Sequence, residues 1–193
     1  MDNNINVGEM FLDILGNKSY IPLDQQCVAV FGKVNKEEWL SAVDNLTDTS
    51  LSFFGETPET LYDNIKMPNR ATVGSAGYDI YTPFDIDVKA GEWCELPLGI
   101  NCEIRPGWFL MLMPKSGLGF KYGMRFANTM GIIDSDYVNA DNGGHIKLKF
   151  TVEKDLHLNK GSKIIQGIFM QFGLVDNDIS IGTRHGGFGS TGE

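Results

Sequence analysis

The sequence is poor in positive charge. Its 193 residues include 16 Lys and Arg against 25 Asp and Glu, which gives a net charge of −9. Proteins that wrap nucleic acid owe most of their affinity to Lys and Arg on phosphates, so the composition argues against that class. An acidic chain can still bind a small phosphorylated ligand through a few local cations and a divalent metal ion. We therefore expect no nucleic-acid partner.

Cysteine and long apolar runs are also scarce. The three cysteines, Cys27, Cys94 and Cys102, are odd in number and lack a metal-ligand spacing, so we expect reduced thiols. The N-terminal residues lack the basic start and apolar run of a signal peptide. No apolar stretch approaches the roughly 20 residues that span a bilayer. These absences predict a cytoplasmic protein without a membrane partner.

Residues 1–66 show helical patterns, in contrast to the rest of the chain. A helix is predicted from Asn35 to about Leu46, where Asn35 and Glu38 form a capping-box pattern. A second short helix is predicted from Thr57, because a proline follows that capping residue. The apolar stripes of both helices can pack against the body or offer a groove to a partner protein. We expect an α-containing extension that carries no chemistry of its own.

From residue 67 onward the pattern becomes that of β-structure. Short apolar runs, such as 108–113 and 164–172, and alternating ones, such as 146–152, are separated by turn signals. This rhythm is typical of a sandwich, jelly roll or barrel. We expect a mainly β core over residues 67–183, followed by a Gly-rich segment over 184–193 that has no apolar periodicity.

One stretch, residues 131–137, combines a strand with acidic chemistry. Two β-branched residues read as a strand end, and Asp134 and Tyr137 follow them closely. A carboxylate on a rigid strand end can act as a general base, and a tyrosine face can pack against a sugar ring. A plain polar turn explains these seven residues equally well when they are taken alone.

Four further segments carry polar groups suited to a nucleotide. Asp79 follows small residues at a strand start and could hold a metal-bound water, although an aspartate at a turn is the commoner case. Asn128 offers a donor and an acceptor for a pyrimidine edge. Gln166 interrupts an apolar run and therefore needs polar partners. The remaining candidates are phosphate donors, which could also be a polar loop and a disordered tail: Lys115, Ser116, Gly117, Arg184, Phe188, Gly189, Ser190 and Thr191.

In this order, the five segments resemble the five motifs of the trimeric dUTPase family, over about residue 67 to the end. The resemblance implies a jelly-roll-like β-barrel, assembled as a homotrimer whose sites draw on all three chains. It also implies hydrolysis of dUTP to dUMP and pyrophosphate, with Mg²⁺ on the triphosphate.

The resemblance assigns a role to each motif residue. Asp134 would activate the water that attacks the α-phosphorus, and Tyr137 would pack under the deoxyribose and exclude a 2′-hydroxyl. Asn128 would contact uracil, and Asp79 would lie near the water shell of the metal. Phosphate contacts and the closing arm would come from Lys115, Ser116, Gly117, Gln166, Arg184, Phe188, Gly189, Ser190 and Thr191.

Three departures from the family pattern stand out. Lys115 replaces the usual arginine, so it lacks the planar fork of a guanidinium. The loop of residues 138–144 is longer than usual and resembles that of a branch found in Gram-positive bacteria and their phages. If the protein is encoded by a phage, the expected location is the cytoplasm of its host. Arg184 is one residue closer to Phe188 than is common.

Two other functions are compatible with this pattern. A dCTP deaminase, or a bifunctional deaminase–dUTPase, shares the fold implied by the resemblance, but such enzymes use a glutamate where this chain has Asp134. A protein that only binds dUTP, and presents residues 1–66 to a partner, is the alternative from a different class.

Overall fold

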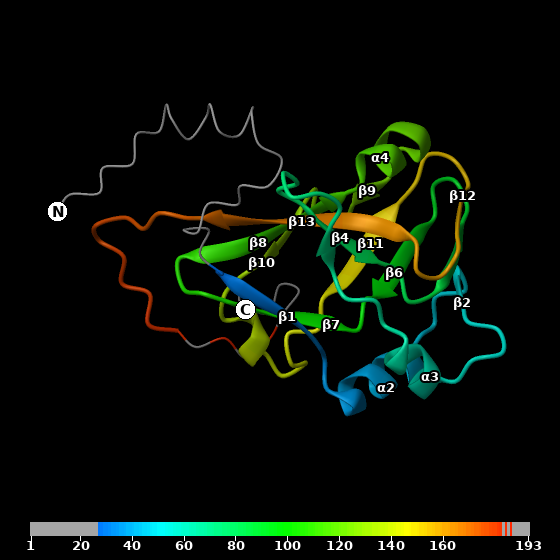
Figure 1. The fold of residues 1–193 in the computed structure, drawn as a ribbon, viewed down its shortest axis with the longest axis horizontal. Helices are drawn as coiled ribbons and strands as arrows, with labels where there is room; N and C mark the ends of the chain where they lie inside the picture. The colour runs from blue at the N-terminus through cyan, green and yellow to red at the C-terminus, as the bar shows by residue number, and fades with distance from the viewer. Residues whose placement is uncertain (1–26, 183, 185, 187–193) are drawn as a thin grey trace.

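The computed structural model describes residues 27–182, 184 and 186, most of which lie in or between short antiparallel strands (Figure 1). The predicted residues Phe188, Gly189, Ser190 and Thr191 lie outside this part. The strands are β1 Ala29–Lys33, β2 Leu51–Ser52, β3 Asn69–Arg70, β4 Tyr78–Tyr81, β5 Asp85–Val88, β6 Trp93–Pro97, β7 Ile100–Ile104, β8 Trp108–Pro114, β9 Arg125–Phe126, β10 Gly131–Ile133, β11 Lys147–Thr151, β12 Leu156–Leu158 and β13 Lys163–Gln171. The helices are α2 Lys36–Asp44, α3 Pro58–Asp63, α4 Ser116–Tyr122 and the 3₁₀ turn η1 Tyr137–Asn139.

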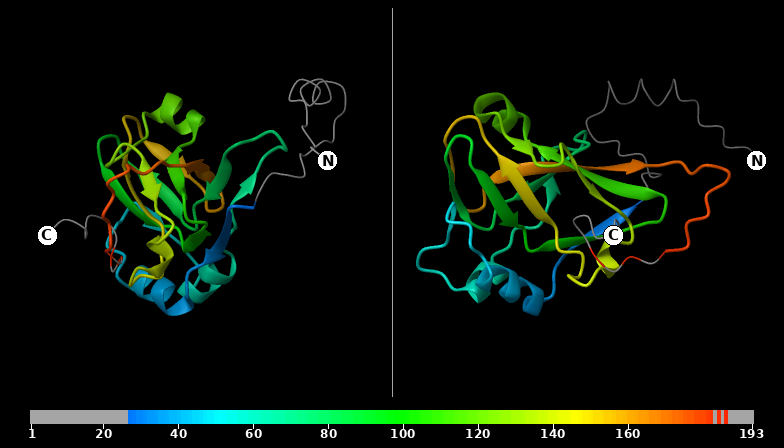
Figure 2. Two further views of the ribbon diagram at one scale, coloured as in Figure 1. Left: turned by 90° about the vertical axis from the view of Figure 1, so that its left-hand side faces the viewer. Right: turned by 180° about the vertical axis from the view of Figure 1, so that it is seen from behind.

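The strands form one large sheet and several small ones. The large sheet has the order β10-β8-β13-β4-β3, and the small sheets are β6-β11-β9, β12-β5-β2 and β1-β7. Strands β8, β11 and β13 coincide with the three apolar runs predicted from the sequence. The expectation of a mainly β fold is therefore confirmed, and Figure 2 shows the sheets wrapping around a common interior.

The core lies between the sheets and is closed at one end by α2 and α3. Its largest fully buried side chains include Trp39, Phe84 and Phe150. The indole of Trp39 stacks on Phe84 with 5.7 Å between the ring centroids, and its Nε1–H donates to Pro58 O at 2.8 Å. Gly99, at φ +69°, gives this indole room, because a Cβ there would lie 2.8 Å from the ring.

Both predicted helices are present, but one capping prediction is half wrong. Asn35 Oδ1 accepts the backbone N–H of Glu38 at 2.7 Å, and Thr57 Oγ1 accepts that of Thr60 at 3.2 Å. In a full capping box the carboxylate of Glu38 would return to the N–H of Asn35. It instead leaves α2 and contacts His145, at 2.9 Å.

The extension shares the core with the β body over its described residues, 27–66. Strand β1 pairs with β7, strand β2 pairs with β5, and Trp39, Val43 and Leu61 are buried among residues from the body. The predicted boundary near residue 66 remains a prediction, as does a partner site on the extension. Figure 1 shows α2 and α3 at one end of the molecule and α4 at the other.

The three cysteines are free, as predicted: Cys27 is exposed, and Cys94 and Cys102 are buried. Burial raises the pKa of the Cys102 thiol to about 12, so it stays protonated and unreactive near neutral pH. In the described residues, no helix has the length and apolarity that a membrane crossing requires.

Candidate functional site

The large sheet brings four of the five sequence segments together. Its order β10-β8-β13-β4 places the segment of Asp134 beside that of Lys115, followed by the segments of Gln166 and Asp79. Gln166 pairs with Asp79 on one side and with Met113 on the other. Segments about 90 residues apart in sequence thus become neighbours, as a site built from separate motifs requires.

At one end of β8, two lysines surround the carboxylate of Asp79. This side chain is only 4% exposed; Lys115 Nζ hydrogen-bonds to its Oδ1, and Lys163 Nζ lies 2.6 Å from its Oδ2. Burial by itself would raise the pKa of Asp79, but the hydrogen bonds from the two ammonium groups outweigh it and hold the pKa below its ordinary value. The cluster carries one excess positive charge, which suits an anionic ligand.

Ser116 and Gly117 form the first turn of α4, a helix that was not predicted from the sequence. Lys115 occupies the capping position without a side-chain capping bond, because an ammonium group has no acceptor for a backbone N–H. Its ammonium group instead donates to Asp79 Oδ1. Ser116 and Gly117 are both exposed. Their hydroxyl and backbone N–H groups are therefore accessible to an incoming phosphate.

At the other end of β8, Asp134 directly follows the last residue of β10, as the sequence predicts. Its side chain is 47% exposed. Arg184, 18% exposed, contacts Asp134 through Nη2 and Asp136 Oδ1 through Nε at 2.8 Å. The same guanidinium lies 5.8 Å from the centre of the Tyr137 ring. The structure thus places Arg184 on carboxylates of its own chain, not in a group of phosphate donors.

Tyr137 is held firmly behind Asp134. It is 6% exposed; its hydroxyl donates to His145 O at 2.9 Å and accepts from Asn142 Nδ2 at 3.1 Å. Burial raises the pKa of this hydroxyl, so it remains a donor near neutral pH. The ring is fixed at both its hydroxyl and its backbone, where Tyr137 N donates to Asp134 O at 3.1 Å.

Asn128 lies in the turn between β9 and β10, at the end of β10 opposite to Asp134. It is exposed, and the next residue, Thr129, adopts φ 67°, a conformation unusual for a residue other than glycine. An isolated bridge between Phe126 and Thr129 closes this turn. The strands on either side of it do not pair with each other: β9 pairs with β11, and β10 pairs with β8.

The two groups of site residues are far apart within one chain. Ile133 pairs with Leu110, so Asp134 lies level with Phe109, whereas Lys115 follows the far end of β8. The six residues from Phe109 to Lys115 span about 20 Å at about 3.3 Å per residue. Asp134 and Tyr137 therefore cannot contact the same small group as Lys115 and Asp79 of their own chain.

Three residues close to the predicted site residues were not predicted as site residues from the sequence. Lys163 and Asp136 lie inside the predicted segments but gave no signal of their own, because their partners come from other strands or from the C-terminal segment. His145 follows the unusually long loop of residues 138–144 and is completely buried. The length of this loop was the only feature of the sequence that drew attention to the region of His145.

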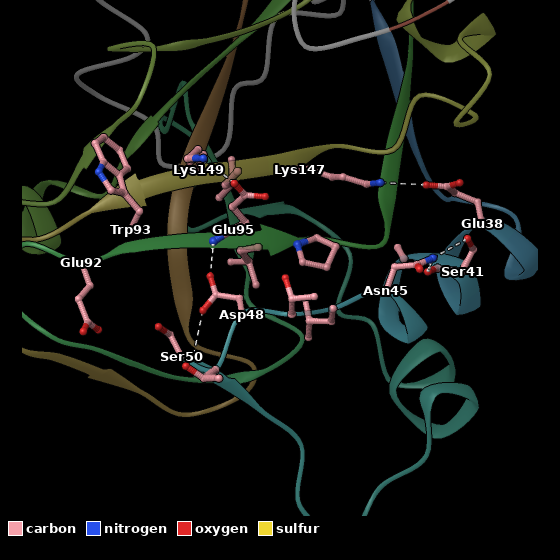
Figure 3. A pocket seen from close by; sticks show the side chains of 17 residues that line it. Glu38, Ser41, Asn45, Asp48, Ser50, Glu92, Trp93, Glu95, Lys147 and Lys149 are labelled. Carbon is pink, nitrogen blue, oxygen red and sulfur yellow. Dashed lines mark hydrogen bonds and ion pairs between the residues drawn. The ribbon is translucent and has the colours of Figure 1, made fainter.

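A cavity of about 940 Å³ lies elsewhere, between α2, residues 45–50, β6 and β11 (Figure 3). Acidic and basic side chains line it together with Trp93, and two ion pairs lie within it, Lys149–Glu95 at 2.6 Å and Lys147–Glu38 at 3.3 Å. None of the predicted site residues that the structure describes lines it. The cavity is therefore separate from the groups on the large sheet.

An antiparallel β fold with these motifs around one sheet defines a class of nucleotide-binding proteins, and comparison with known proteins identifies the family. The dUTPase family profile matches residues 63–192. A Lactococcus lactis protein called deoxyuridine 5′-triphosphate nucleotidohydrolase is 36% identical over 140 residues, which cover 69% of this chain and 93% of the relative. A Pectobacterium carotovorum protein of the same name is 37% identical over 139 residues, 65% of this chain and 86% of the relative. The chain belongs to the dUTPase family.

Solved structures agree with this assignment. The dUTPase of Streptococcus mutans is 32% identical, superposes with a TM-score of 0.52, and is matched over 57% of this chain and 89% of its own. A mutant dUTPase of phage phi11 of S. aureus, which coordinates a structural Mg(II) ion, is 16% identical with a TM-score of 0.51, over 62% of this chain and 92% of its own. The second likeness concerns the fold alone.

Proposed function

We propose that this chain hydrolyses dUTP to dUMP and pyrophosphate, and that Asp134 is the base that activates the attacking water. Family membership and relatives named as dUTP nucleotidohydrolases support the activity. The position of Asp134 supports its role, because its half-exposed carboxylate stands on a rigid strand end beside a fixed tyrosine. The observation that carries the proposal is this pairing of an accessible carboxylate with Tyr137 inside the family match.

The other predicted site residues each contact a different part of the nucleotide. The Tyr137 ring packs under the deoxyribose and leaves no room for a 2′-hydroxyl, and Asn128 contacts the uracil edge. The phosphates are bound by groups that donate hydrogen bonds or carry positive charge, from Lys115, Ser116, Gly117 and Gln166. Arg184 must leave Asp134 before the carboxylate can accept a proton, and the C-terminal arm with Phe188, Gly189, Ser190 and Thr191 then closes over the substrate.

We further propose that the working enzyme is a homotrimer with shared sites. One triphosphate must touch Asp134 and the phosphate-binding group around Lys115, and these lie about 20 Å apart along β8 of one chain. A neighbouring copy can supply the missing half of each site. The contact of Arg184 with its own Asp134 is then replaced by contacts in the site of another chain.

Mg²⁺ enters this proposal on the nucleotide. Asp79 does not fit a magnesium site, because its buried carboxylate already contacts two ammonium groups. In the described residues no three His, Cys, Asp or Glu side chains come together as a metal centre. Mg²⁺ bound to the triphosphate would neutralise phosphate charge, and the chain would hold the complex through its phosphate donors. The assignment of Asp79 to the metal remains a prediction that this arrangement does not favour.

Complementation tests the activity and the shared site together. Asp134→Asn removes the proton acceptor, and a chain ending at residue 183 removes Arg184 and the arm, so each homotrimer should be almost inactive towards dUTP. Mixed trimers, refolded together and isolated with two different tags, should regain pyrophosphate release, because some sites then combine an intact Asp134 with an intact arm. Mixed trimers as inactive as their parents would refute the shared site.

Substrate choice separates hydrolysis from deamination. Wild-type protein should release pyrophosphate from dUTP in preference to the other deoxynucleoside triphosphates, and it should release no ammonia from dCTP. Ammonia from dCTP, without pyrophosphate from dUTP, would contradict the proposed function.

A further inference from the structure

The carboxylate of Glu38 links the extension to the site. Glu38 lies on α2, outside the residues 63–192 that match the family. Its Oε1 lies 2.9 Å from His145 Nδ1 and 3.3 Å from Lys147 Nζ. Figure 3 shows Glu38 leaving α2 towards Lys147 on β11. A residue of the extension thus contacts the loop that precedes β11.

The hydrogen-bond partners of His145 determine its tautomer. Gly99 N donates to Nε2 at 2.9 Å, so Nε2 is the nitrogen without a proton. Burial lowers the pKa of His145 to about 4, against the raising effect of the Glu38 hydrogen bond, so the ring is neutral near pH 7. Its single proton is therefore on Nδ1 and is donated to Glu38. The ring is held from both sides in one orientation.

The loop that carries His145 in turn holds Tyr137. His145 O accepts the Tyr137 hydroxyl at 2.9 Å. The loop packs tightly against η1, because a Cβ on Gly144 would lie 2.7 Å from Val138 Cα. A shift of the His145 backbone would therefore move the Tyr137 hydroxyl with it. Two hydrogen bonds at His145, one through its side chain and one through its backbone carbonyl, thus connect Glu38 on α2 with the Tyr137 hydroxyl.

We propose that Glu38 is a positioning residue for sugar discrimination, which acts through His145 to hold the Tyr137 ring against the deoxyribose. The inference rests on the proposed function of Tyr137. It gives the extension a part in the selection of dUTP over UTP. The proposal requires an oxygen at this position that accepts from Nδ1–H; it requires no ion pair, because the imidazole is neutral.

Two substitutions at one position separate the hydrogen bond from the charge. Glu38→Gln keeps an oxygen that accepts from Nδ1–H, so the ratio of kcat/KM for dUTP to that for UTP should stay within about twofold of wild type. Glu38→Ala removes the acceptor, and the ratio should fall by roughly fivefold or more, the effect expected of one hydrogen bond. The ratio does not depend on the fraction of folded protein, so a merely structural loss would not change it.

Two controls sharpen this comparison. Lys147→Met removes the other partner of Glu38 and should leave the ratio unchanged. In a Tyr137→Ala background, Glu38→Ala should cause no further loss, because a residue that acts through the ring has no effect without it. If Glu38→Ala does not fold, Glu38→Asp, shorter by one methylene, provides the same comparison.

The outcomes distinguish the two proposals. A wild-type protein without dUTP hydrolysis would overturn the proposed function and this inference with it. An active Glu38→Ala variant that keeps the wild-type ratio, or an active Glu38→Asp variant that keeps it where Glu38→Ala does not fold, would overturn the inference alone. An equal loss in Glu38→Gln and Glu38→Ala would also overturn it, since the charge would then be responsible.

Discussion

The buried His145 makes the stability of the fold depend on pH. Its imidazole is 0% exposed and neutral, with Nε2 accepting from Gly99 and Nδ1 facing Glu38; Lys147 is the nearby cation. The unfolded chain binds a proton there below pH 6.5, whereas the folded chain does so only near pH 4. The stabilisation is therefore complete above pH 6.5 and is lost as the pH falls towards 4.

The size of the effect follows from these two pKa values. A fall from 6.5 to about 4 corresponds to about 3 kcal/mol, at about 1.4 kcal/mol per pKa unit. About 2 kcal/mol of it should already be lost near pH 5. Domains of ordinary stability have a free energy of unfolding of about 5–15 kcal/mol, so a loss of this size is large enough to measure.

Urea unfolding at a series of pH values, with equal protein concentrations, measures this effect. His145→Gln keeps a group that can accept from Gly99 N but does not titrate in this range, so its stability should fall less steeply below pH 6.5 than that of wild type. His157→Gln is the matched control, because His157 is exposed on β12, and its curve should run parallel to wild type. Parallel curves for wild type and His145→Gln would refute the reasoning.

Three further predictions concern single side chains. Tyr137→Ala should lower the preference for dUTP over UTP, measured as the ratio of the two kcat/KM values; an unchanged ratio would contradict the role of its ring. Lys115→Arg should keep or raise activity, because a guanidinium can still contact Asp79 and adds a planar fork; a loss above about tenfold would show that the loop requires lysine. Trp39→Ala should cost about 3–5 kcal/mol in urea unfolding, because the indole is completely buried against Phe84; a cost below about 1 kcal/mol would mean that the extension contributes little to the core.

Much of the local structure could be predicted from the sequence. The capping residues Asn35 and Thr57 mark the starts of α2 and α3, since such signals act over three or four residues. The apolar runs mark β8, β11 and β13 for the same reason. Helix α4 was missed because its two glycines, Gly117 and Gly119, weaken the helical pattern.

The sequence likewise predicted some features of the candidate site and not others. The order and spacing of the motifs identified the family and placed Asp134 directly after a strand, and both results depend only on residues close together in sequence. The partners of Asp79 could not be predicted, because Lys115 and Lys163 reach it from other segments.

The sequence by itself therefore determined the family, the mainly β fold and the identity of the motif residues, because these depend on short-range patterns. The tertiary structure alone decided which side chains meet. Strand β8 separates Asp134 from Lys115 by about 20 Å, a distance that depends on register. The carboxylate of Glu38 contacts the buried imidazole of His145, 107 residues away, and not the backbone N–H of Asn35 that the capping box predicts. Only the folded chain brings these two residues together.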